Sequence, residues 1–149
     1  MPGSDLTGPL ALSPHVATDP VPASDGPALI MPADGIVDLN ALRAAVEAAL
    51  SEAGGTGTAT ARREAVTTVL RAAMERGRAT LAAAFAEAPH NARELAGSYA
   101  FLADTIVTTT LWAATELLHP LQSTSVSDRL ALLAVGGYGR AEMAPYSDI

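Results

Sequence analysis

Two glycines, an arginine and an aspartate near the end of this 149-residue chain are the residues best suited to chemistry. Gly136 and Gly137 follow a short apolar run, and ten residues separate them from Asp148. Glycines let an anionic group approach the backbone closely, and their amides can face its oxygens. Arg140 can bind a phosphate through two hydrogen bonds, or cap a helix and face solvent. The order of these residues predicts a phosphate-binding turn followed by a carboxylate.

The elements that must position these residues are a strand, a turn and a second strand. Arg129 to Val135 is a run of Leu, Ala and Val without alternating polarity, which is typical of a strand buried on both faces. A second strand that begins near Asp148 would bring its carboxylate back over the glycine turn. Because residues i and i+2 of a strand share a face, a metal site here needs Asp148 and a further carboxylate after Ile149. Glu142 is interpreted as structural, since an acidic residue suits the first turn of a helix.

The residues before this strand are predicted to form a mainly helical body. Hydrophobic residues make up 49% of the chain and aromatic residues only 4%, which favours helices packed through Ala, Leu and Val. Helical spacing of apolar residues predicts helices over 39–53, 61–88 and 91–118. Asp38 is the expected cap of the first, and the last two are expected to form an antiparallel hairpin.

The predicted organisation has three parts. Residues 1–37 are rich in Pro, Gly, Ser and Asp, and we expect a disordered extension there. Residues 38–128 form the helical lead-in, and residues 129–149 begin a catalytic domain. The predicted fold class is therefore mainly α, with a helical hairpin followed by the first strand-turn-strand of an incomplete α+β domain.

Composition argues against several classes of function. The net charge is −7 and all nine basic residues are Arg, so the chain is a poor candidate for binding nucleic acid. The absence of Cys excludes disulfides and thiolate metal sites, and it fits a cytoplasmic protein. Acidic and polar residues interrupt the longest apolar stretch, so we expect no membrane span.

The segment GGYGRAEMAPYSDI resembles the start of the nucleotidyltransferase domain of the bacterial protein-PII uridylyltransferase/uridylyl-removing enzymes. In that family a GGYGRGEL-type turn leads into an SDxD carboxylate pair. The helical sequence before it also resembles the family, so the likeness covers roughly Thr60 to Ile149. Ala141 stands where the family usually has Gly, which matters if that backbone needs a positive φ.

The resemblance implies a specific reaction for the whole enzyme. UMP is transferred from UTP to a tyrosine of the nitrogen-regulatory protein PII with Mg²⁺, and it is removed again when glutamine, the effector, is abundant. Mapped onto this chain, Gly136 and Gly137 would hold phosphates, Arg140 would assist them, and Asp148 would be a catalytic metal ligand. Paired carboxylates hold the metal in such transfers, so we expect the 149-residue chain alone to be inactive.

Two alternatives stay open from the sequence. One is a nucleotidyltransferase similar to the glutamine-synthetase adenylyltransferase, which differs in lacking the GYGR run of residues 137–140. The other is a helical interaction module that has no catalytic role. Coil instead of strand over 129–135, with Asp148 far from Gly136 and Gly137, would favour the interaction module.

Overall fold

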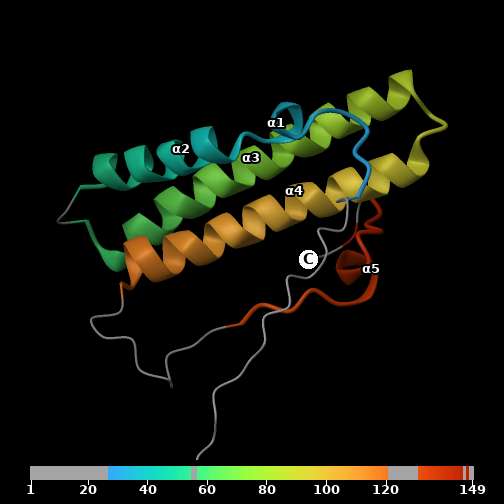
Figure 1. Cartoon of the computed structure of the whole chain (residues 1–149). Coiled ribbons are helices and arrows are strands. Elements are labelled where there is room, and N and C mark those ends of the chain that lie inside the picture. The colour runs from blue at the N-terminus through green and yellow to red at the C-terminus, as the bar shows by residue number, and fades with distance from the viewer. Residues whose placement is uncertain (1–26, 55–56, 121–130, 146, 148–149) are drawn as a thin grey trace, which may run out of the picture.

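Three helices that lie along a common direction make up most of the structure (Figure 1). The computed structural model describes residues 27–54, 57–120, 131–145 and 147. In chain order the elements are α1 (Ala33–Ile36), α2 (Leu39–Glu52), α3 (Ala59–Glu87), α4 (Ala92–Trp112), the π-helix η1 (Ala113–Leu118) and α5 (Gly136–Gly139). The mainly helical fold class is confirmed for these residues.

Side-chain caps fix where the first two long helices begin. The carboxylate of Asp38 accepts hydrogen bonds from the amides of Asn40 and Ala41 at 2.8 and 3.0 Å, which confirms the predicted cap of α2. At the start of α3, the Thr58 hydroxyl accepts from the Ala61 amide at 3.2 Å. Such caps satisfy backbone donors that the first turn of a helix leaves without partners.

The predicted helix over 91–118 is present as α4 and η1, with a change of winding at Ala113. Asn91, a residue type that often caps helices, precedes α4 but makes no capping hydrogen bond through its side chain. Near the end of α4, the hydroxyls of Thr109 and Thr110 donate to the carbonyls four residues earlier at 2.6 and 2.7 Å. Hydroxyls bonded in this way compete with the backbone amides for the helical carbonyl acceptors. The π-helix η1 follows directly.

Packing between α3 and its neighbours forms the core. The antiparallel α3–α4 hairpin is confirmed, with α2 on the first half of α3 (Figure 1). One core cluster joins α2, the first half of α3 and η1; the other joins α1, the second half of α3, the first half of α4 and Met143. Gly77 lies where α3 and α4 meet, since a Cβ there would come within 2.6 Å of the Leu102 Cδ1.

Residues 27–37 differ from the expected disordered extension. Ile36, in α1, is 5% exposed within the core, and the Ile30 amide donates to the Ser98 hydroxyl at 2.9 Å. Gly97 lets this segment cross α4, since a Cβ there would lie 2.9 Å from the Ala28 carbonyl oxygen. Burial of the scattered apolar residues in 29–37 explains the order, and periodicity over so short a stretch could not show it. Residues 1–26 lie outside the described residues.

The predicted strand over 129–135 is absent from residues 131–135, the part of it that the structure describes. Residues 131–135 have no regular structure, and Leu132, Leu133 and Val135 are 53%, 85% and 67% exposed. A strand needs a partner for its backbone groups, and no described segment pairs with this one. The structure of these five residues therefore corrects the expectation of burial on both faces. Residues 129, 130, 148 and 149 lie outside the described part, so the second strand cannot be placed.

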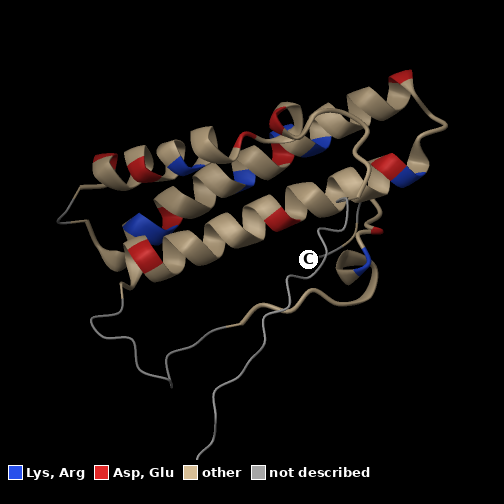
Figure 2. Ribbon diagram, viewed as in Figure 1, with Lys and Arg blue, Asp and Glu red and all other residues tan. Residues whose placement is uncertain are grey.

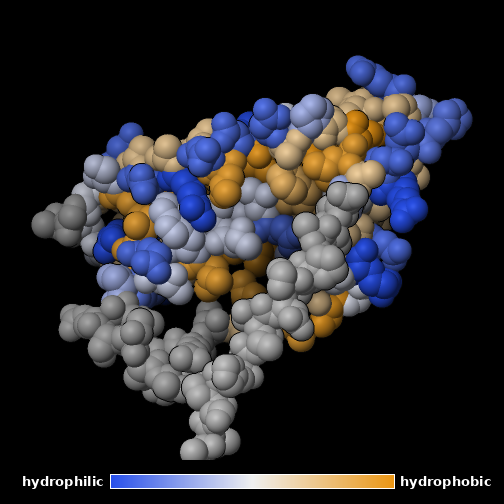
Figure 3. All heavy atoms as spheres, viewed as in Figure 1, coloured by the Kyte–Doolittle hydropathy of each residue, from blue (hydrophilic) through white to orange (hydrophobic). Residues whose placement is uncertain are grey.

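The surface mixes charges and apolar areas. Acidic and basic residues are interspersed on α2 and α3, and the described residues form no basic stripe (Figure 2); apolar areas alternate with hydrophilic ones on the face in Figure 3. Among the described residues, no helix combines the length and apolar character that a membrane crossing requires.

Candidate functional site

The two glycines of the predicted phosphate-binding turn lie at the start of the short helix α5, directly after extended Val135. Gly136 has a φ of +62°, and a Cβ on it would meet no atom within 4 Å. A Cβ on Gly137 would lie 2.9 Å from the Glu142 carbonyl oxygen. Gly136 therefore faces open space that a ligand could use, whereas Gly137 is required to close the turn.

The turn ends in a Schellman motif. The Glu142 amide donates to the Gly137 carbonyl at 2.8 Å, and the Ala141 amide donates to the Tyr138 carbonyl at 3.0 Å. Ala141 occupies the left-handed position that this motif usually gives to glycine, with a φ of +56°. The Gly-to-Ala difference from the family motif thus falls on a residue whose backbone does need a positive φ.

Arg140 and Glu142 form an ion pair on the surface of this turn. The Arg140 Nε donates to the Glu142 Oε2 at 3.0 Å, and both side chains are 66% exposed. Pairs this exposed contribute little stability and exchange readily with solvent. Arg140 can therefore leave Glu142 for a more highly charged anion.

Tyr138 and Met143 attach the turn to the helical body. The Tyr138 hydroxyl donates to the Asp104 Oδ1 of α4 at 2.7 Å, and Met143 is 5% exposed in the core cluster with Leu95 and Tyr99. Burial, then the hydrogen bond to Asp104 and the negative charge of that carboxylate, raises the pKa of Tyr138 from 10.0 to about 12. Sequence reasoning missed both anchors, although Met143, the only large apolar residue in 139–145, was a usable signal.

A groove of about 480 Å³ borders the turn. It lies between the 27–28 segment, the first turn of α4 and residues 140–142. The lining residues with charged side chains are Arg93, Glu94, Arg140 and Glu142. The groove therefore carries both signs of charge beside the predicted phosphate-binding turn.

The carboxylate half of the predicted site cannot be compared with the turn, because Asp148 lies outside the described residues. No group of three or more His, Cys, Asp or Glu side chains that could hold a metal occurs in the described ranges. Glu142, the acidic residue of the turn, is paired with Arg140. These residues do not by themselves fit a magnesium site.

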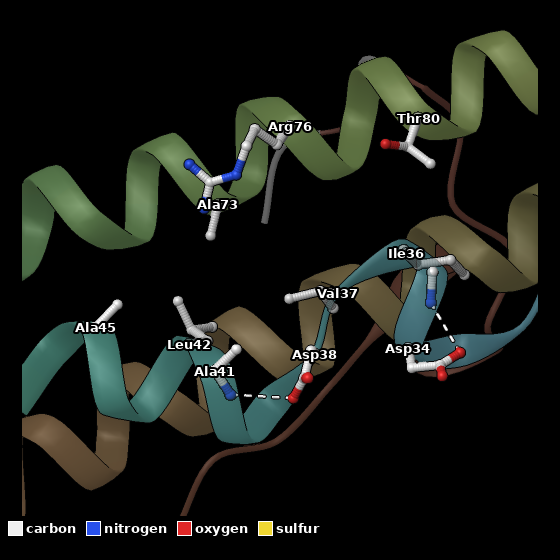
Figure 4. Close-up of a pocket in the computed structure, with 11 residues that line it drawn as sticks. Asp34, Ile36, Val37, Asp38, Ala41, Leu42, Ala45, Ala73, Arg76 and Thr80 are labelled. Carbon is white, nitrogen blue, oxygen red and sulfur yellow. Dashed lines mark hydrogen bonds between the residues drawn. The ribbon is translucent and has the colours of Figure 1, made fainter.

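A second hollow, of about 290 Å³, lies between the α1–α2 junction and α3 (Figure 4). Its carboxylates serve the backbone, since Asp34 accepts from the Gly35 amide and Asp38 from the Ala41 amide (Figure 4). Arg76 and Thr80 come from α3 on the opposite wall. Gly136, Gly137 and Arg140, the predicted site residues that the structure describes, do not line this hollow.

Comparison with known proteins gives a consistent result. The chain is 43% identical over 136 residues to a bifunctional uridylyltransferase/uridylyl-removing enzyme of Cereibacter sphaeroides, a match that covers 86% of the chain. Proteins of the same name from Ruegeria pomeroyi and Erythrobacter litoralis are 48% and 42% identical over 87 and 114 residues, or 58% and 76% of the chain. The chain matches a segment of the bifunctional uridylyltransferase/uridylyl-removing enzymes.

The match covers a small part of each relative. The chain spans 14% of the Cereibacter protein, 10% of the Ruegeria protein and 12% of the Erythrobacter protein. No family model matches the chain, and no solved structure matches it. The resemblance found in the sequence is therefore confirmed as similarity to a segment of these enzymes.

Proposed function

We propose that this chain is the helical lead-in and glycine turn of an enzyme that transfers UMP from UTP to a tyrosine of protein PII, and that the whole enzyme also removes the UMP. The observation that carries the proposal is the 43% identity over 86% of the chain to a uridylyltransferase/uridylyl-removing enzyme. PII as protein substrate, glutamine as effector, magnesium as cofactor and a cytoplasmic location are parts of the same proposal. They rest on the resemblance.

The geometry of the turn supports part of this proposal. The open side of Gly136 and the exposed Arg140 suit an approaching triphosphate, because the backbone can be reached and a cation is at hand. Gly137 we now assign to closing the turn. Asp148 is kept as the proposed metal ligand. Magnesium binding would need at least one further carboxylate beyond those described, because Mg²⁺ is held by several oxygens.

The two alternatives differ in their support. The exposed coil at 131–135 is what a non-catalytic helical module would give, although the position of Asp148 needed to complete that case lies outside the described residues. An adenylyltransferase is less well supported, since the relatives are uridylyltransferases by name. Transfer from UTP but not from ATP would separate the two enzymes.

The test of the proposed function is a transfer assay in the complete enzyme that carries this segment, with labelled UTP, PII and Mg²⁺. Asp148→Asn is expected to abolish transfer and to leave removal of UMP intact, since removal belongs to another domain under this proposal. Glu87→Gln, which changes an exposed carboxylate at the C-terminal end of α3 that does not line the groove, is the matched control and should leave both activities unchanged. Full transfer by the Asp148 variant would refute the assignment.

The 149-residue chain provides a second arm of the same test. We expect it to transfer no UMP to PII under these conditions, because a single proposed carboxylate ligand is too few to hold the metal. Transfer by this chain above the level of a protein-free blank would overturn the proposed role of paired carboxylates.

A further inference from the structure

We propose that Tyr138 and Asp104 are positioning residues, whose hydrogen bond holds the glycine turn in a fixed orientation on helix α4. This inference rests on the proposed function for what the turn binds, a nucleoside triphosphate. It assigns to the helical body a direct part in that binding. Neither residue is placed in contact with the nucleotide.

The composition of α5 makes Tyr138 the main side-chain contact between this helix and the helical body. Three of its four residues are glycines, so Tyr138 is the only residue of α5 with a side chain beyond the backbone. It is half-buried against the core cluster, and its hydroxyl donates to Asp104 Oδ1 at 2.7 Å. A hydrogen bond to a carboxylate is among the stronger kinds. Tyr138 therefore sets the orientation of the α5 backbone relative to α4.

Besides Tyr138, Ala141 and Met143 are the residues of this region that pack on the core cluster. The preceding residues, 131–135, are exposed and irregular, so they cannot hold Gly136 from the N-terminal side. Met143 anchors the chain six residues after Gly137 and fixes where the turn lies, but a flexible thioether in a core leaves its orientation less defined. The bond from Tyr138 to α4 supplies the missing orientation.

Amide hydrogen exchange tests the contact in the 149-residue chain, independently of any activity. In Tyr138→Phe and in Asp104→Asn, the Ala141 and Glu142 amides, which close the Schellman turn, should exchange about tenfold faster. The double variant should be no faster than either single one, because both changes remove the same bond. Asp104→Glu should keep most of the protection, since an acceptor remains within reach. Glu87→Gln should exchange like the unchanged chain.

Tyrosine absorption gives a spectroscopic signature of the same contact. Tyr138 is expected to ionise with a midpoint of about 12, a step that Tyr138→Phe removes. In Asp104→Asn the midpoint should fall toward 10 without reaching it, because burial is the larger cause of the raised pKa. Unchanged exchange in both single variants, or an unchanged titration in Asp104→Asn, would overturn the contact.

Kinetics of the complete enzyme test whether the contact positions the nucleotide turn. Tyr138→Phe should raise KM for UTP about tenfold and change kcat less than about twofold, since the turn is loosened but its groups are retained. Faster exchange with an unchanged KM would overturn the positioning role. If the unchanged enzyme transfers no UMP at all, the proposed function fails, while exchange and titration still decide the contact.

Discussion

At the scale of single residues, Ala141 shows the clearest backbone strain in the turn. A left-handed backbone places the Cβ of an L-residue too close to its own carbonyl oxygen, at a cost of about 1–2 kcal/mol. The sequence showed that Ala replaces the Gly usual in the resembled family, but only the φ of +56° shows that the replacement is strained. The two hydrogen bonds of the Schellman motif hold the residue there.

Ala141→Gly should stabilise the turn by about 1 kcal/mol, the strain relieved less the backbone entropy that glycine adds to the unfolded chain. The Glu142 amide should then exchange about fivefold more slowly, which hydrogen exchange can measure. Ala144→Gly is the matched control, since Ala144 has no positive φ and should gain nothing. Equal protection in the two variants would contradict the strain.

The site was only partly predictable from residue types. Gly136, Gly137 and Arg140 do lie together in one turn, as their spacing indicated. Their roles differ, because a glycine that faces solvent and one that faces a carbonyl look the same in a sequence. The bond from Tyr138 to Asp104 joins residues 34 positions apart, and neither periodicity nor a local motif reports such a contact.

At the scale of elements, the close approach of α3 to α4 depends on Gly77. Helix α3 is continuous from Ala59 to Glu87, and the missing side chain of Gly77 makes room for Leu102. The helices themselves were predictable, because caps, breaks and apolar spacing are local signals. The strand expected over 129–135 was not predictable in this way, because an apolar run forms a strand only if another segment pairs with it. No described segment pairs with residues 131–135.

Gly77→Ala should destabilise the chain by about 1–2 kcal/mol, since Leu102 is fully buried and overpacking outweighs the better helix propensity of alanine. The free energy of unfolding in urea, followed by helical circular dichroism, measures the change. Arg78→Ala, at the exposed neighbouring position, is the control and should have little effect. In a Leu102→Val background the Gly77→Ala change should cost less or become stabilising. An equal cost in both backgrounds would contradict the proposed overlap.

For the molecule as a whole, the core reaches from Ile36 in α1 to Met143 after the turn. This cluster joins the two ends of the described chain through α3 and α4, so the turn is attached to the body rather than trailing from it. The sequence indicated a helical body and a separate catalytic start, and it placed residues 27–37 outside the core. Their contribution depends on tertiary burial, which local composition does not report.

Met143→Ala removes a buried side chain and should weaken the docking of the turn on the helical body by about 2–4 kcal/mol. Limited proteolysis should then cleave at Arg140 many times faster, while the α2–α4 body stays protected. Met31→Ala, at a partly buried residue packed on the same cluster, is the control and should change cleavage at Arg140 much less. Equal cleavage of the Met143 variant and the unchanged chain would show that Met143 does not hold the turn.

Docking through Met143 also bears on the order of events during synthesis. The ribosome completes α3 and α4 before it reaches Gly136, and these two helices are consecutive in the chain and pack against each other. The surface that receives Met143, built from α1, α3 and α4, can thus exist before that methionine emerges. The nascent helices would then act as a template onto which the glycine turn assembles after they have folded.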